Sequence, residues 1–194
     1  MCSGEDMDEL FGIPAHPLVV HAPVVLLPLA VLGVIGMMVR PSWYLHFRWP
    51  VLAITAIGTV GAVLAASSGE ELEELVEDSK SGAAREAIEG HADAGEGART
   101  LAIAFLVAVV AYVLIPWFLE RRARSASAAG AADESPRRAE PMWLRPVLMV
   151  LVALTAIGSL ITIIDAGHSG ADSVWNEVGV VGGDDDGDDG DDGD

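Results

Sequence analysis

The fold is decided by an uncharged stretch of the chain, TLAIAFLVAVVAYVLIPWFL, which occupies residues 100–119. An α-helix rises 1.5 Å per residue, so about 20 apolar residues cross roughly 30 Å of hydrocarbon. Three further windows of similar length carry almost no charge, at residues 17–39, 49–69 and 146–164. Because the windows lack the alternation of β-strands, they predict an all-α protein, a four-helix transmembrane bundle over residues 16–176. We therefore expect a multi-pass protein of the cell membrane that contacts the lipid bilayer.

The net charge is −18, from 29 acidic and 11 basic residues. Eight aspartates in the tail 184–194 contribute to it, but the remaining chain still carries −10, so the acidic bias is general and typical of a salt-rich environment. No basic patch exists to neutralise phosphates, which argues against nucleic-acid binding. The repelling charges predict a disordered acidic tail over 177–194, and residues 1–15 form an acidic N-terminal segment. Cys2 is the only cysteine, which excludes disulfides within the chain and thiolate-based metal sites.

Basic residues predict which side of the membrane each connection occupies. The short connection after the first window holds Arg40 and Arg48 and no acid, and the connection after the third window is rich in arginine. By contrast, residues 70–98 hold ten acids against Lys80 and Arg85. The positive-inside rule then places both termini and the 70–98 connection outside the cytoplasm. Within that connection, Leu72–Val76 and Arg85–Ile88 predict short helical segments, the second leading into the third span.

Histidines are the best functional clue, because four of the five fall on the predicted extracytoplasmic side: His16, His21, His91 and His168. An ionisable residue in or near hydrocarbon is costly and indicates a functional site, and imidazole is the commonest protein metal ligand. His16 and His21 are five residues apart, so they point about 140° apart on a regular helix and cannot share one ligand. We expect His21 to lie one helical turn inside the membrane, beside a bend at Pro23 and Pro28. His46 lies on the other side and is expected to be an ordinary interface residue.

Carboxylates near these histidines provide candidate partners. Asp165 precedes His168 by three residues, and Glu70 follows the second window directly. Either could orient an imidazole that binds a cofactor. Together with Asp93 they could also widen the choice of metal in a mixed histidine and carboxylate site. No catalytic triad order, phosphate-binding glycine loop or zincin motif is present, so neither hydrolysis nor nucleotide chemistry has support.

The second and fourth windows share a weak internal repeat. Thr55-Ala56-Ile57-Gly58 matches Thr155-Ala156-Ile157-Gly158, and Ser68-Gly69 matches Ser169-Gly170 with a slip of one residue. The first and third windows each follow a histidine. A duplicated two-helix hairpin would explain this pattern.

Four segments, taken in order, resemble the family called domain of unknown function 2231: HPLVVHAPVVLLPLAVLG (16–33), LAASSGEELEE (64–74), GHADAGE (90–96) and GHSGADSVW (167–175). The resemblance covers nearly the whole chain and implies a small membrane protein with four spans. Histidine placement in the family has invited comparison with membrane b-type cytochromes, and some relatives are joined to Rieske iron–sulfur domains. The resemblance therefore points to His21, His91 and His168 first, with His16 as a fourth position. This chain has no Rieske cysteines, so a redox partner would be a separate molecule.

Three functions remain open at this stage. In the first, two histidines from different helices ligate one haem b near the outer leaflet, His21 with His91 or His168, and electrons pass to a redox partner protein or a quinone. The second is a metal site built from the histidines with Glu70, Asp93 or Asp165. The third is a cofactor-free membrane subunit whose histidines pack helices or sense external pH. A homo-oligomer is compatible with each of the three. Electron transfer rather than catalysis on a substrate is expected, and neither donor nor acceptor can be named.

Overall fold

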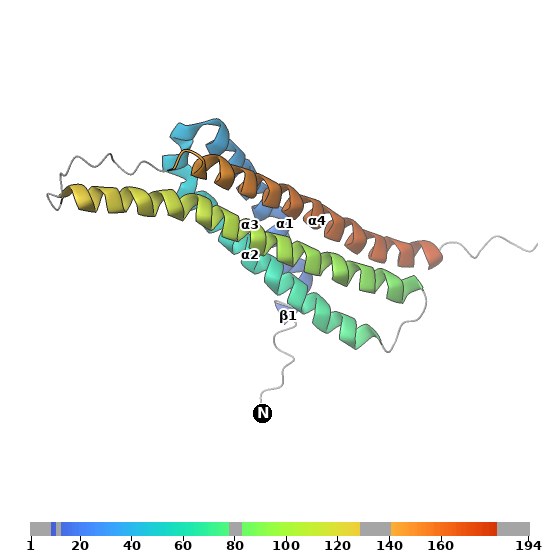
Figure 1. Cartoon of the computed structure of the whole chain (residues 1–194). Coiled ribbons are helices and arrows are strands. Elements are labelled where there is room, and N and C mark those ends of the chain that lie inside the picture. Colours follow the sequence, from blue (N-terminus) through green and yellow to red (C-terminus); the bar gives the residue numbers. More distant parts are fainter. Residues whose placement is uncertain (1–8, 11–12, 78–82, 129–140, 182–194) are drawn as a thin grey trace, which may run out of the picture.

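Four long helices dominate the computed structural model, which describes residues 9–10, 13–77, 83–128 and 141–181 (Figure 1). They are α1 (Ala15–Val39), α2 (Pro41–Glu77), α3 (Ala83–Ala128) and α4 (Leu144–Val181). Each holds a segment long and apolar enough to cross a membrane: Val19–Val39, Pro41–Gly69, Glu89–Ser125 and Leu144–Ala171. The predicted fold class is confirmed. A two-stranded antiparallel hairpin, β1 (Glu9–Leu10) and β2 (Ile13–Pro14), precedes α1 and was not predicted.

The helices are longer than the apolar windows. α2 begins at Pro41, so the first connection shrinks to Arg40, whose amide donates to the carbonyl of Gly36 at 2.9 Å. Proline is well tolerated at the first position of a helix, where its missing amide hydrogen is not needed. The segments expected to be helical at 72–76 and 85–88 are confirmed as parts of α2 and α3. α4 continues to Val181, so residues 177–181 of the tail expected over 177–194 lie within this helix. Residues 182–194 lie outside the described residues.

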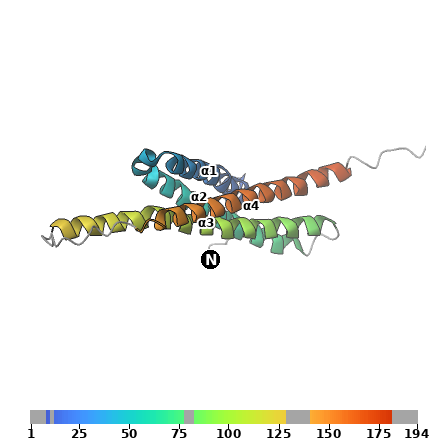
Figure 2. The ribbon, with the colours of Figure 1, turned by 45° about the horizontal axis from the view of Figure 1, so that its top comes forward.

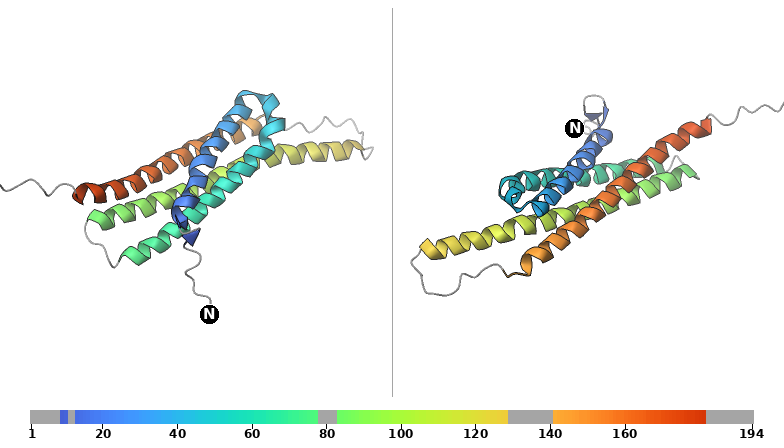
Figure 3. Two further views of the ribbon diagram at one scale, coloured as in Figure 1. Left: turned by 180° about the vertical axis from the view of Figure 1, so that it is seen from behind. Right: turned by 90° about the horizontal axis from the view of Figure 1, so that it is seen from above.

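The helices form two antiparallel hairpins, α1 with α2 and α3 with α4 (Figures 2 and 3). The hairpins join mainly through contacts between α2 and α3, while α1 and α4 touch at only a few positions. We call the end where α1 and α3 begin and α2 and α4 end the histidine end. The opposite end, which holds Arg40, Arg48, Arg121 and Arg145, is the arginine end. This up-and-down order brings four distant parts of the sequence together at each end.

The interior of the bundle is filled by apolar side chains from all four helices. Phe105, Leu27, Val34 and Val152 are almost completely buried. The outward surfaces are equally apolar, with Leu32 and Leu154 more than 60% exposed. Such exposure suits lipid, where helices associate through close packing and interhelical hydrogen bonds rather than by escape from water. One such bond runs from the hydroxyl of Thr59 to the carbonyl oxygen of Ala102, at 3.3 Å.

Two glycines of the internal repeat make equivalent contacts. A side chain at Gly58 would meet the Cγ of Leu27 at 3.0 Å, across the α1–α2 interface. A side chain at Gly158 would meet Leu101 at the same distance, across the α3–α4 interface. In both hairpins a small residue thus admits a leucine of the preceding helix. The matching contacts favour the interpretation of a duplicated hairpin.

Candidate functional site

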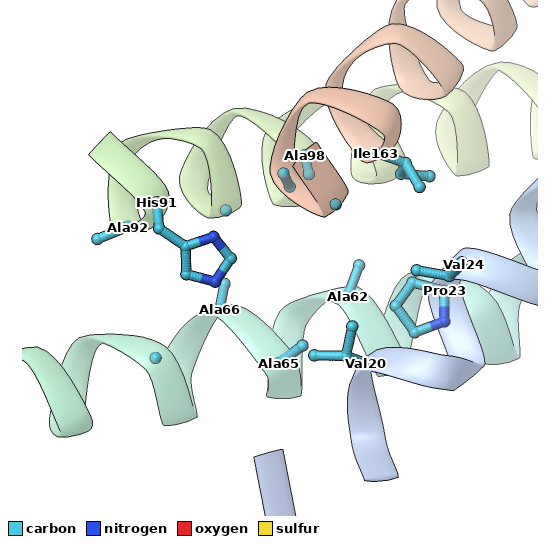
Figure 4. A pocket seen from close by; sticks show the side chains of 14 residues that line it. Val20, Pro23, Val24, Ala62, Ala65, Ala66, His91, Ala92, Ala98 and Ile163 are labelled. Carbon is cyan, nitrogen blue, oxygen red and sulfur yellow. The ribbon is translucent and has the colours of Figure 1, made fainter. Parts of the chain in front are cut away.

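A pocket of about 100 Å³ lies between the four helices at the histidine end (Figure 4). It is lined almost entirely by apolar or small residues, and each helix contributes at least three of them. The lining residues are Val20, Pro23 and Val24 of α1; Ala62, Ala65, Ala66 and Gly69 of α2; His91, Ala92, Gly95 and Ala98 of α3; and Ile163, Ala166 and Gly167 of α4. For comparison, an enclosed apolar cavity of about 150 Å³ stays dry and accepts benzene, a single aromatic ring.

Small residues at helical spacing create this space. On α2 the lining positions Ala62, Ala65, Ala66 and Gly69 recur at intervals of three and four residues, so they share one face of the helix. Apart from the chain neighbours of Gly95 and the backbone of its own helix, no heavy atom lies within 4 Å of the place where a side chain at Gly95 would begin. The pocket therefore exists because the sequence places alanine and glycine where the bundle would otherwise carry larger side chains.

His91 is the one ionisable residue of the pocket lining. Its imidazole extends from α3 toward α2 beside Ala66 (Figure 4). Its Nδ1 lies 3.1 Å from the hydroxyl oxygen of Ser169 on α4. That hydroxyl donates to the carbonyl oxygen of Ala166, also at 3.1 Å, so it is placed to accept a hydrogen bond from Nδ1–H. In the neutral ring, Nε2 is then the acceptor nitrogen.

Gly170 lets the imidazole approach α4. A side chain at this position would come within 2.9 Å of the His91 Cε1 and 3.4 Å of its Nδ1. Ser169 thus holds the Nδ1 edge of the ring by a hydrogen bond, and Gly170 leaves room for the same edge to approach α4. Both residues follow His168 directly in the sequence, and no sequence pattern indicated that they contact His91. Only the pairing of α3 with α4 reveals this role.

The other histidines do not line the pocket. His21 is exposed, although its neighbours Val20 and Val24 are lining residues. His168 is also exposed, and at 100° per residue it points about 150° away from the pocket face of α4. His16 lies in the first turn of α1, and its side chain is not among those described. The structure therefore does not bring His21 or His168 to the pocket beside His91.

The carboxylates expected as partners are similarly dispersed. Asp165 and Asp93 are exposed, and the side chain of Glu70 is not among those described. The hydrogen-bond partner that the structure gives to the Nδ1 of His91 is Ser169, a residue not predicted for that role. Within the described part of the chain, no three side chains of histidine, cysteine, aspartate or glutamate are close enough to hold a metal ion.

His46 lies at the arginine end, away from this site. Its Nδ1 is 3.2 Å from the carbonyl oxygen of Ser42, one turn earlier in α2, and the side chain is exposed. This position agrees with the expected interface residue.

Comparison with known proteins gives one match, to a family model described as a predicted membrane protein, DUF2231, over residues 12–181. Neither the curated proteins nor the solved structures include a match to the chain. The matched region contains all four helices and every lining residue of the pocket. The four apolar helices, their order and the matched region lead to one conclusion: the chain belongs to the DUF2231 family of predicted membrane proteins.

Proposed function

We propose that this membrane protein binds a lipid-soluble ring compound of the quinol class in the pocket at the histidine end. The observation that carries the proposal is a single imidazole, held by Ser169, in an apolar pocket of about 100 Å³. Ligand sites commonly combine an apolar lining with a few placed polar groups that fix orientation. Here the small apolar lining residues can pack against a ring, and the imidazole of His91 can bind one polar substituent of that ring.

The proposed binding chemistry follows from the neutral form of His91. A quinol hydroxyl donates a hydrogen bond to Nε2, while the ring lies against the small residues of α2 and α3. Ser169 holds the opposite nitrogen, so the acceptor points in a fixed direction. Because the pocket borders the spans of all four helices, a hydrophobic tail on the ligand could extend into the surrounding lipid.

Replacing His91 with alanine should weaken quinol binding about tenfold, because the hydrogen bond from the quinol to a half-buried imidazole is lost. The measurement is isothermal titration of the purified full-length protein in detergent with decylubiquinol. His168→Ala is the matched control, since this histidine lies at the same end of the bundle but is exposed and outside the lining. Equal binding by both variants would refute the role of His91.

Haem b is a second candidate, favoured by one observation. A metal-ligating histidine usually donates its other ring nitrogen to a protein group, as Nδ1 of His91 is placed to do toward Ser169. The fit is incomplete, because His21 and His168 do not line the pocket and about 100 Å³ is too little for a porphyrin ring. Haem would need wider helix separation and a second axial ligand from elsewhere. For this reason haem ranks below a single-ring ligand.

The absorption spectrum distinguishes the two candidates. Protein purified from cells supplied with haem precursor is expected to show no Soret band and no sharp α band after reduction with dithionite. A strong Soret band that His91→Ala removes and His168→Ala preserves would establish haem ligation by His91 instead.

A further inference from the structure

Two arginines converge on one buried tyrosine at the arginine end. The guanidinium carbons of Arg48 on α2 and Arg145 on α4 lie 5.7 Å and 5.6 Å from the ring centre of Tyr44. Tyr44 is only 3% exposed, and its hydroxyl donates to the carbonyl oxygens of Tyr112 and Val113, each at 3.2 Å. The buried ring is therefore a platform that a guanidinium group from each hairpin contacts.

The guanidinium of Arg48 is incompletely satisfied. Its Nε and Nη1 are buried and have no hydrogen-bond partner among the described residues. The group also lies 5.6 Å from the ring of Trp49 and interacts with the side chain of Tyr44, and these contacts leave Nε and Nη1 without an acceptor among the described residues. Buried N–H donors without an acceptor are costly, and in native proteins such donors are normally hydrogen-bonded. Arg48 thus indicates an acceptor that the described side chains do not supply.

The charge around this platform is strongly one-sided. Six arginines have described side chains at the arginine end: Arg40, Arg48, Arg121, Arg122, Arg124 and Arg145. The described acids at this end are limited to Glu120, which pairs with Arg124 at 3.2 Å. In a chain of net charge −18, this concentration of unbalanced arginine attracts anions.

We propose that Arg48 and Arg145 bind the phosphate of an anionic lipid headgroup, with Tyr44 as the platform between them. Guanidinium forks suit phosphate oxygens, and the unpaired Nε and Nη1 of Arg48 are donors that a phosphate would satisfy. Basic pockets between transmembrane helices are known to recognise such headgroups. Trp43, Trp49 and Trp117 lie at the same end, and tryptophan favours the depth of the headgroups. The site is separate from the His91 pocket and does not depend on the function proposed for it.

Native mass spectrometry of the full-length protein can measure this binding. The protein in detergent is titrated with phosphatidylglycerol and with phosphatidylcholine in separate experiments, and inorganic phosphate is then added to the complex with phosphatidylglycerol. We expect phosphatidylglycerol to bind at one site per chain more tightly than phosphatidylcholine. Arg48→Gln and Arg145→Gln should each weaken it about fivefold, the effect of roughly 1 kcal/mol per arginine. Inorganic phosphate should not displace the lipid at millimolar concentration.

Arg122→Gln is the matched control, because it removes the same charge from an exposed position at the same end. It should change lipid affinity less than twofold. Equal losses in all three variants would reduce the effect to general surface charge and overturn the site. Displacement by inorganic phosphate would overturn the lipid assignment. If a variant fails to fold, the proposal is tested by the unaltered protein alone, which should prefer phosphatidylglycerol over phosphatidylcholine. Equal binding of the two lipids would refute the proposal.

Discussion

Leucine in place of Gly61 should push α1 away from α2 and lower the melting temperature by about 6–12 °C, a cost of roughly 3 kcal/mol. A side chain at Gly61 would meet the Cβ of Ala22 and the Cδ of Pro23, each at 2.9 Å. Neither neighbour can turn aside, because alanine has no rotamers and the proline ring is fixed. The helix itself must therefore move. Thermal unfolding of the purified protein in detergent measures the effect.

Val60→Leu is the control for this variant. Val60 immediately precedes Gly61 in α2 and is 57% exposed, so a larger side chain there extends into the surroundings. Its melting temperature should stay within about 1 °C of the unaltered protein. A Gly61→Leu protein as stable as the Val60→Leu protein would show that α1 and α2 do not approach as closely as described.

Leucine in place of Gly95 should abolish quinol binding and leave the fold intact. Gly95 lines the pocket, and a side chain there would begin in open space, so leucine fills the cavity of about 100 Å³ without displacing another residue. Leucine also favours a helix over glycine by about 0.8 kcal/mol, so the melting temperature should hold or rise. Titration with decylubiquinol and thermal unfolding of the same sample test the two expectations together.

The Gly90→Leu variant separates the effect of filling the pocket from the effect of a higher helix propensity. Gly90 is on the same helix, also has open space around it, and lies outside the pocket lining. This variant gains the same helix propensity but should bind quinol as the unaltered protein does. If Gly95→Leu binds equally well, the ligand does not use this pocket and the proposed function fails. The lipid site at Arg48 and Arg145 would be unaffected by that result.

The four spans were predictable because every helix that crosses the hydrocarbon core must be long enough and must lack charged residues. A window such as 100–119 needs only length and absence of charge, which a local reading of the sequence detects. The ends of the helices were harder to predict. Residues 41–48 were expected in a connection, but α2 begins at Pro41, because polar and aromatic residues at an interface are equally compatible with helix.

The site was predictable only in part. His91 stood out as a histidine in a segment of small residues at the start of a span, and it does line the pocket. His21 stood out beside Pro23 and Pro28, and His168 stood out near Asp165, but both histidines are exposed and outside the lining. A local pattern reports that a histidine lies near one membrane face. It does not report toward which neighbouring helix that histidine points.

The sequence by itself determined the number of spans, the family and the gathering of arginines at one end of the bundle. Only the tertiary structure decided which groups meet: Ser169 and Gly170 with His91, and Arg145 with Arg48 across Tyr44. The physical reason is that hydropathy is a property of each segment alone. A contact between helices depends on the rotation of both helices about their axes, and in lipid that rotation is set by the close packing of small residues.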